Sequence, residues 1–340
     1  MIYKNDYPLK DHHTFGMDVK VAHFVEYSSV EELLHVLPRL WGEWKELPFF
    51  HMGGGSNLLF LRDYYPGVIF HSAIMGWQVV KEDEETLHLR VGAGVVWDDL
   101  VSYCVSQGWG GMENLSLIPG EVGASAVQNI GAYGVETKDL IVSVDTIDIA
   151  TGEHRSFSLH ECSYGYRKSI FKEELKGKYI ITHVTYCLHK HPEFRLDYGN
   201  IRTELERMEM GVSLNSVRSA VIRIRESKLP DPKVLGNAGS FFMNPIVPRE
   251  TMERIRQDYP TMPYYEVDEN LVKIPAGWMI EQCGWKGRAM GRAAVHDKQA
   301  LVLVNLGGAT WLEVKTLCDT VRHDVKEKFN VEIHPEVNFI

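Results

Sequence analysis

Cysteine is scarce in this 340-residue sequence, and long apolar runs are missing. The five cysteines, Cys104, Cys162, Cys187, Cys283 and Cys318, are scattered and form no Cys-x-x-Cys pair. This spacing argues against a disulfide framework or a zinc site and favours a reducing compartment. No stretch approaches the ~18 apolar residues of a membrane span, and the N-terminus has no apolar segment of signal-peptide length. We therefore expect a cytoplasmic protein that does not bind membranes.

Positive charge is also in short supply, with 36 Lys and Arg against 46 Asp and Glu and a net charge of −10. A general nucleic-acid binder carries a basic footprint, so we expect no nucleic-acid partner. The histidines show no recognisable metal-ligand spacing, and we expect no metal site. The 44% hydrophobic and 24% charged residues are ordinary for a globular chain, whose length predicts two or three domains.

The order of predicted elements favours an α+β fold, because strands and helices do not alternate regularly. Predicted strands cover 21–26, 48–52, 87–91 and 179–188, and 141–150 and 154–159 form a hairpin around Thr151-Gly152. Predicted helices begin at Ser29 (with Glu32 completing a capping box), Trp97, Ser213, Pro275 and Thr310. The apolar, extended segment 331–340 is expected to pack against the protein.

The first glycine-rich stretch is Gly53-Gly54-Gly55-Ser56-Asn57, directly after a predicted strand. Consecutive glycines expose backbone N–H groups and tolerate positive φ, which suits a diphosphate. The stretch is not a P-loop, since no Gly-Lys-Ser/Thr follows it, and it is not a dinucleotide fingerprint. A plain flexible turn is the alternative reading.

The second glycine-rich stretch runs from Pro119 to Gly134 and contains almost no bulky side chain. Small residues at this density permit the close approach of a flat, extended ligand. Tight packing of backbone on backbone explains the composition equally well. Two such stretches in one chain together favour a large cofactor.

Four residues outside these stretches are candidates for chemistry. Arg167, in Tyr166-Arg167-Lys168, could hold a carboxylate with its planar guanidinium, or it could form a surface ion pair. Ser240 could donate a proton or simply belong to a turn. Glu336 lies in the apolar C-terminal segment, where a carboxylate has a function more often than in a solvated tail. Lys228 could reach a phosphate or compensate a helix dipole.

The order and spread of these segments resemble the UDP-N-acetylenolpyruvoylglucosamine reductase family over nearly the whole chain. The matching segments are Gly53–Asn57, Ile118–Gly134, Tyr166-Arg167, Ser227–Pro232, Gly239–Phe242, Pro275–Gly277 and the C-terminal Glu336. Tyr198, in Leu196-Asp197-Tyr198-Gly199-Asn200, resembles the mobile-loop tyrosine of the longer form of these enzymes. Met243 is a departure, because family members often carry Lys there, which puts one positive contact to the nucleotide in doubt.

The resemblance implies a three-domain α+β flavoprotein with an FAD-binding fold of the vanillyl-alcohol-oxidase type and a C-terminal substrate-binding domain. The implied division is 1–75, rejoined by the tail 330–340, then 76–210 and 211–329. FAD is the implied cofactor, NADPH the hydride-donating co-substrate and a UDP-sugar the substrate. We expect a monomer.

The resemblance also assigns roles to residues. Arg167 and Glu336 polarise the enolpyruvyl carboxylate, with Glu336 protonated or sharing a proton, and Ser240 donates a proton. Tyr166, Tyr198, Lys228 and Asn244 contact the substrate. The implied flavin contacts are Gly53, Gly54, Gly55, Ser56, Asn57, Ile118, Pro119, Gly120, Gly123, Ala124, Gln128, Asn129, Gly131, Ala132 and Tyr133.

The implied reaction is the reduction of UDP-N-acetylglucosamine enolpyruvate to UDP-N-acetylmuramate for peptidoglycan synthesis. A hydride passes from reduced flavin to the methylene carbon, and a proton follows from Ser240. One alternative is a flavin oxidase of the vanillyl-alcohol-oxidase type, although no strong candidate for covalent FAD attachment lies near 119–134. A non-catalytic nucleotide-sugar binding protein is the other alternative, and a colourless purified protein would favour it.

Overall fold

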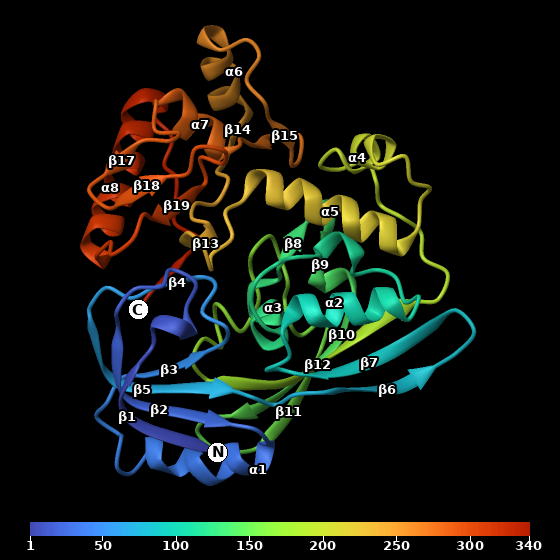
Figure 1. The fold of residues 1–340 in the computed structure, drawn as a ribbon, viewed down its shortest axis with the longest axis vertical. Helices are drawn as coiled ribbons and strands as arrows, with labels where there is room; N and C mark the ends of the chain where they lie inside the picture. Colours follow the sequence, from blue (N-terminus) through green and yellow to red (C-terminus); the bar gives the residue numbers. More distant parts are fainter. The chain divides into compact units, whose positions relative to one another are not determined.

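The computed structural model describes all residues 1–340, which divide into two compact units. Unit 1 contains Met1–Tyr7, Val21–Gly54 and Pro66–Ser227, and unit 2 contains Pro8–Lys20, Gly55–Tyr65 and Lys228–Ile340. Both units mix helices and sheets, which confirms the predicted α+β class (Figure 1). None of the helices combines the length and hydropathy needed to traverse a bilayer.

The first sheet of unit 1 has the strand order β1 (Ile2–Pro8), β2 (Lys20–Tyr27), β5 (Tyr64–Ser72) and β3 (Phe49–Met52). Helix α1 (Val30–Val36) lies along one face of this sheet (Figure 1). The hydroxyl of Ser29 accepts from the Glu32 backbone N–H at 3.2 Å, as the capping pattern predicts. Leu33 and Val36 then pack in one core with Tyr27 and Phe70.

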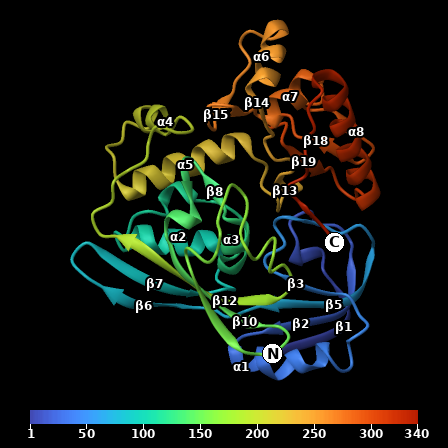
Figure 2. The same cartoon turned by 180° about the vertical axis from the view of Figure 1, so that it is seen from behind.

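The second sheet of unit 1 is antiparallel. Its order is β11 (His154–Ser158), β10 (Ile141–Asp148), β12 (Tyr179–His189), β7 (Thr86–Gly92) and β6 (Trp77–Glu82). The predicted hairpin between β10 and β11 is confirmed. Helices α2 (Trp97–Ser106) and α3 (Val122–Gln128) cover one face of this sheet in both views (Figures 1 and 2). Trp97, Ala126 and Val184 share its buried core.

The remaining elements of unit 1 are α4 (Ile201–Arg207), α5 (Leu214–Lys228), whose last residue falls in unit 2, and the small hairpin of β8 (Gly131–Ala132) and β9 (Val135–Glu136). Arg218 on α5 forms a two-pronged ion pair with Asp98 on α2, at 2.7 and 2.9 Å. Asp98 also accepts from the backbone N–H of Leu117 at 2.5 Å. The Asp98 carboxylate therefore fixes the backbone at Leu117, just before the second glycine-rich stretch.

Unit 2 contains a sheet with the strand order β13 (Gly236–Ser240), β19 (Val302–Asn305), β18 (Ala293–Val295) and β17 (Ala289–Met290). A second sheet has the order β14 (Ile246–Pro248), β16 (Leu271–Lys273) and β15 (Tyr265–Glu266). The helices of unit 2 are α6 (Arg249–Asp258), α7 (Ala276–Gln282) and α8 (Trp311–Phe329). Near the C-terminus, β20 (Asn338–Phe339) pairs in parallel with β4 (Leu58–Leu59). Val331, Ile333 and Val337 are buried, so the apolar tail packs as predicted.

Two sequence-based details need correction. Pro275 is the N-cap of α7 and not its first helical residue, so that the helix begins at Ala276. No helix was predicted within the second glycine-rich stretch, but Val122–Gln128 forms helix α3. Its sequence has poor intrinsic helix propensity, and burial of Val122, Ser125 and Ala126 against the sheet outweighs that deficit.

Candidate functional site

The two glycine-rich stretches touch each other in unit 1. A Cβ added at Gly53 would lie 3.3 Å from the Cβ of Ala124, and one at Gly54 would lie 3.4 Å from the Cα of Gly120. Just after β3, Gly53 therefore meets the methyl group of Ala124, and Gly54 meets the backbone of Gly120. Glycines have no side chain to keep an anion away from their peptide groups, and the only longer side chain beside these two is that of Glu121. The geometry fits the diphosphate of FAD.

Other glycines in the same stretches are required by packing. Gly55 has φ +61°, and its added Cβ would lie 2.1 Å from the His12 carbonyl oxygen. An added Cβ at Gly123 would lie 2.9 Å from Ala93 Cβ. At Gly131 it would lie 2.8 Å from Glu136 Cγ. At these positions, close approach within the protein is sufficient to demand glycine.

Gly55→Ala tests this reading against a matched control. Gly16 has the same φ of +61° but no atom within 4 Å of an added Cβ. We expect Gly16→Ala to lower the free energy of unfolding by about 1 kcal/mol, which is the cost of the left-handed backbone alone. Gly55→Ala adds a collision with backbone and should cost more than about 3 kcal/mol. Urea unfolding of both variants measures the difference, and equal losses would contradict the packing argument.

Asn129 ends helix α3 with a left-handed backbone, φ 45°. Its side chain is fully buried and donates to Glu136 Oε2 and to the Gly165 carbonyl, both at 2.9 Å. The amide oxygen accepts from the Lys138 backbone N–H at 3.0 Å and from the Thr137 hydroxyl at 3.3 Å. The Asn129 side chain thus joins the β8–β9 hairpin to the loop around Gly165. Its amide N–H groups and its amide oxygen are all satisfied by hydrogen bonds within the protein.

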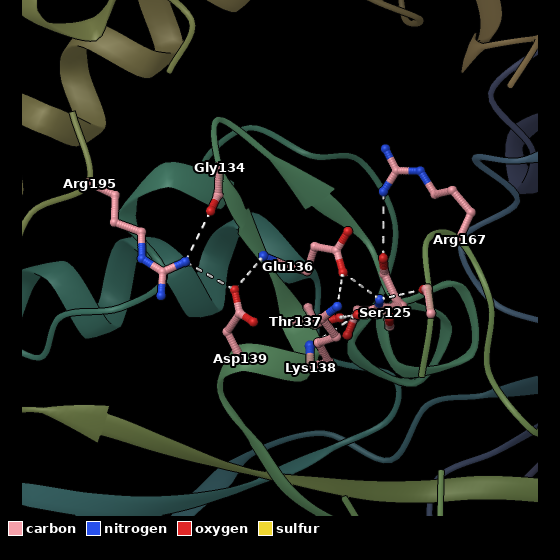
Figure 3. Close-up of polar contacts among 10 residues, drawn as sticks. Ser125, Gly134, Glu136, Thr137, Lys138, Asp139, Arg167 and Arg195 are labelled. Atoms are coloured by element: carbon pink, nitrogen blue, oxygen red, sulfur yellow. Dashed lines mark hydrogen bonds and ion pairs between the residues drawn. The ribbon is translucent and has the colours of Figure 1, made fainter. Parts of the chain in front are cut away.

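Arg167 lies in the tight turn that Asn129 anchors. Reciprocal backbone hydrogen bonds of 3.1 Å join Gly165 and Lys168, and Arg167 between them has φ 57°. The guanidinium of Arg167, which is labelled in Figure 3, donates from Nη2 to the Gly131 carbonyl at 3.1 Å. Below the turn, Ser169 donates to the Val127 carbonyl at 2.7 Å, and Lys172 Nζ donates to Gln128 Oε1 at 2.8 Å. The strained Arg167 backbone is therefore held from several sides.

Asn129→Ala should loosen this turn. It leaves the Lys138 N–H without its partner, which costs about 1–3 kcal/mol, and it removes one of the two hydrogen bonds to the Gly165 carbonyl. We expect a lower free energy of unfolding and, if Arg167 acts on substrate, a lower kcat. Denaturant unfolding and steady-state kinetics on one preparation check both. A stable, fully active variant would show that the Asn129 network is dispensable.

The predicted substrate tyrosines also lie in unit 1. Arg167 Cζ lies 5.6 Å from the ring centre of Tyr166. The Tyr198 side chain is 48% exposed, and its Cβ lies 3.4 Å from an added Cβ at Gly134. Gly199 follows against the ring of Tyr133, where an added Cβ would lie 2.3 Å from Cδ1. An exposed aromatic ring beside small residues is well placed to contact a ligand.

Ser240 and Glu336 are neighbours in unit 2. Ser240 ends β13, is half-buried and pairs with Val302 across the sheet. The next residue, Phe241, accepts a hydrogen bond from the Glu336 backbone N–H at 2.8 Å. Met243 N–H donates to the His334 carbonyl at 2.9 Å, so the C-terminal segment runs beside the strand that carries Ser240.

Asn57 secures the same C-terminal segment. Its amide donates to the Glu336 carbonyl at 3.3 Å, and its own carbonyl accepts from the Asn338 backbone at 3.1 Å. Asn244, a predicted substrate contact, accepts from the Ala276 N–H at 2.9 Å and so also supports the start of α7. Lys228, the last residue of α5, is exposed.

The structure brings together three polar residues to which sequence analysis gave no role. His71 on β5 contacts Glu26 on β2 and Glu121 at the N-cap of α3. No sequence spacing could reveal this group, since the three residues come from separate elements. The proximity of His71 to the glycine turn in the chain was the only available signal.

The comparisons with known proteins cover the whole chain. One family model, described as UDP-N-acetylenolpyruvoylglucosamine reductase, C-terminal domain, matches residues 231–340, and another, described as FAD binding domain, matches residues 21–158. A UDP-N-acetylenolpyruvoylglucosamine reductase from Bacteroides fragilis is 58% identical over 98% of this chain and 99% of its own length. The enzyme of that name from Porphyromonas gingivalis is 44% identical over 100% of both chains.

A solved structure also resembles the chain. The crystal structure of UDP-N-acetylenolpyruvylglucosamine reductase from Thermus caldophilus aligns with a TM-score of 0.69 and 23% identity, over 99% of this chain and 98% of that one. At this identity the likeness concerns the fold alone.

Proposed function

The chain belongs to the UDP-N-acetylenolpyruvoylglucosamine reductase family, and from this premise we propose how its residues divide the work of that reaction. The chain is an FAD-dependent oxidoreductase of peptidoglycan precursor synthesis. We propose NADPH as the reductant and UDP-N-acetylglucosamine enolpyruvate as the substrate, with UDP-N-acetylmuramate as the product. The observation that carries the residue roles is the hydrogen bond from Glu336 N–H to Phe241, which places a carboxyl-bearing residue beside the strand of Ser240.

The backbone around Gly53, Gly54 and Gly120 would hold the diphosphate of FAD. The geometric support is the close contact of the two stretches, in which an added Cβ at Gly53 would lie 3.3 Å from Ala124 Cβ and one at Gly54 would lie 3.4 Å from Gly120 Cα. When bound there, FAD would supply the means to carry a hydride from the nicotinamide to the substrate. Around it, Ile118, Ala124 and Tyr133 belong to the same small-residue segment and complete the proposed binding surface.

Arg167 would stabilise the negative charge that develops on the enolpyruvyl carboxylate as the methylene carbon is reduced. The guanidinium is positioned before substrate arrives, by its bond to the Gly131 carbonyl and by the turn that Asn129 anchors. Fixed donors stabilise developing charge well because they need no reorganisation during the reaction. Glu336 would contact the same carboxylate as an acid that keeps or shares its proton, since an ionised carboxylate would oppose the charge.

Ser240 would then donate its hydroxyl proton to the carbon next to the carboxylate. A hydroxyl is a weak acid in water, but an enolate-like carbon in a dry site is a strong base. The remaining assignments concern substrate binding. Tyr166, Tyr198, Lys228 and Asn244 would contact the sugar nucleotide, and half-buried Met243 supplies no charge where relatives often carry Lys.

Visible spectroscopy during turnover tests the proposal. The purified protein should show flavin absorbance, lose it anaerobically with NADPH, and regain it when the enolpyruvyl sugar nucleotide is added. A flavin that bleaches but is reoxidised only by oxygen would overturn the substrate assignment. We further propose that the enzyme works in the cytoplasm as a monomer, with the three-part division at about residues 75 and 210 that its family resemblance implies.

A further inference from the structure

His71 lies between two carboxylates in unit 1. Its Nδ1 is 2.9 Å from Glu26 Oε2, and its Nε2 is 3.0 Å from Glu121 Oε1. A neutral imidazole carries one N–H and can donate to only one acceptor, whereas an ionised carboxylate cannot donate at all. Two carboxylates bound at once therefore require an N–H on both ring nitrogens. The side chains of His71 and Glu121 are only 15% and 11% exposed, so that water does not readily replace the hydrogen bond between them.

The other titratable groups that face this site are neutral. Tyr27 Oη lies 2.7 Å from His51 Nε2. Burial, with the charge of His71, lowers the pKa of His51 to about 3, and burial raises the pKa of Tyr27. For His71 itself burial lowers the pKa, but the hydrogen bonds and charges of Glu121 and Glu26 outweigh it and the net direction is upward. The charges at the site are thus one imidazolium and two carboxylates.

The Glu121 carboxylate lies beside Gly53 and Gly54, the proposed diphosphate-binding backbone. Its Oε2 lies 3.3 Å from an added Cβ at Gly53, and its Oε1 lies 3.5 Å from an added Cβ at Gly54. A free carboxylate here would repel any diphosphate laid on that backbone, because the site is partly buried and screens charge poorly. The imidazolium of His71, on the same oxygen of Glu121, offsets this repulsion.

We propose that His71 is a cofactor-positioning residue, which as an imidazolium clamped by Glu26 and Glu121 allows an anionic diphosphate to bind at Gly53 and Gly54. This inference rests on the proposed function, in which that cradle holds FAD. FAD affinity should be high while His71 is protonated. It should fall as the pH rises through the raised pKa of His71, since loss of the proton leaves two carboxylates uncompensated.

Equilibrium titration of the deflavinated full chain with FAD, followed by flavin fluorescence between about pH 6 and about pH 9, tests the inference. The wild type should bind about tenfold more weakly at the upper end. His71→Asn should bind about tenfold more weakly than wild type at the lower end and lose the pH dependence. Glu121→Gln should bind at least as tightly as wild type with a flatter pH profile. The double variant His71→Asn/Glu121→Gln should recover to within about threefold of wild type, because the repelling charge is gone.

His183→Asn serves as the matched control. This half-buried histidine also lies on a unit 1 strand, burial lowers its pKa to about 4, and the variant should bind FAD as the wild type does. The inference is overturned if His71→Asn binds FAD as tightly as the wild type at every pH. It is also overturned if adding Glu121→Gln to His71→Asn fails to restore FAD affinity. Should His71→Asn not fold, an unchanged pH profile in Glu121→Gln overturns the inference by itself. A wild type that binds no FAD, or binds it without reducing the sugar nucleotide, would instead count against the proposed function.

Discussion

Ser240→Ala is expected to bind FAD normally and to lose flavin absorbance with NADPH at the wild-type rate, while reduction of the enolpyruvyl sugar nucleotide slows by about 10²–10⁴-fold. The change removes one hydroxyl from the end of β13, and the Glu336 backbone bond to Phe241 remains. Hydride transfer to the methylene carbon would then generate a carbanion with no positioned proton donor. Anaerobic stopped-flow spectroscopy separates the two half-reactions.

A matched control for this variant is Thr320→Ala. Thr320 lies in the same unit on helix α8, where its hydroxyl donates to the Thr316 carbonyl at 2.8 Å. Its loss should leave both half-reactions unchanged. Rapid substrate reduction by Ser240→Ala would show that the proton comes from another group, whereas slow reduction by both NADPH and substrate would indicate damage to the flavin site.

Arg167→Ala is expected to lower kcat by about 10²–10³-fold, which is the usual cost of removing one preorganised charge-stabilising donor. Flavin binding and reduction by NADPH should persist, since Asn129 is held independently by its own side-chain bonds to Glu136 and Gly165. Arg167→Lys should rescue little, because an ammonium cannot reproduce the planar two-pronged donor. Steady-state kinetics with the sugar nucleotide, compared with single-turnover NADPH oxidation, gives both quantities.

Arg195 offers a matched control, because its side chain also contacts the β8–β9 hairpin. It donates to the Gly134 carbonyl at 3.0 Å and to Asp139 at 3.3 Å (Figure 3). Arg167 donates in a similar way to the Gly131 carbonyl. Arg195 is largely exposed, and Arg195→Ala should change kcat little. Equal losses in the two variants would mean that Arg167 supports the hairpin and does not act on substrate.

Local signals in the sequence predicted local structure well. Ser29 was recognised as an N-cap because a capping hydroxyl and its N–H partner are separated by three residues, and the bond forms at 3.2 Å. The β10–β11 hairpin followed from turn residues between two alternating segments. Helix α3 was missed because its Gly, Ser and Val residues lower its helix propensity, and burial against the sheet offsets that deficit.

The candidate site shows the same limit. The sequence identified Gly53–Asn57 as one stretch, but the structure separates it. Gly53 and Gly54 face Ala124 and Gly120, Gly55 is fixed by His12, and Asn57 secures the C-terminal segment. Composition alone could not distinguish a ligand-facing glycine from one that packs on backbone, because both require the absence of a side chain.

By itself, the sequence determined the α+β class, the principal caps and strands, and, through its family resemblance, the residues to which roles in flavin chemistry are proposed. These depend on contacts along the chain or on motifs that survive as strings of residues. The tertiary structure alone decided that the two glycine stretches touch, that Glu336 lies beside Phe241, that Asn129 anchors the turn of Arg167, and that His71 bridges Glu26 and Glu121. Each of these contacts joins residues from separate elements. Their distances are set by how sheets and helices pack, and no spacing along the chain encodes them.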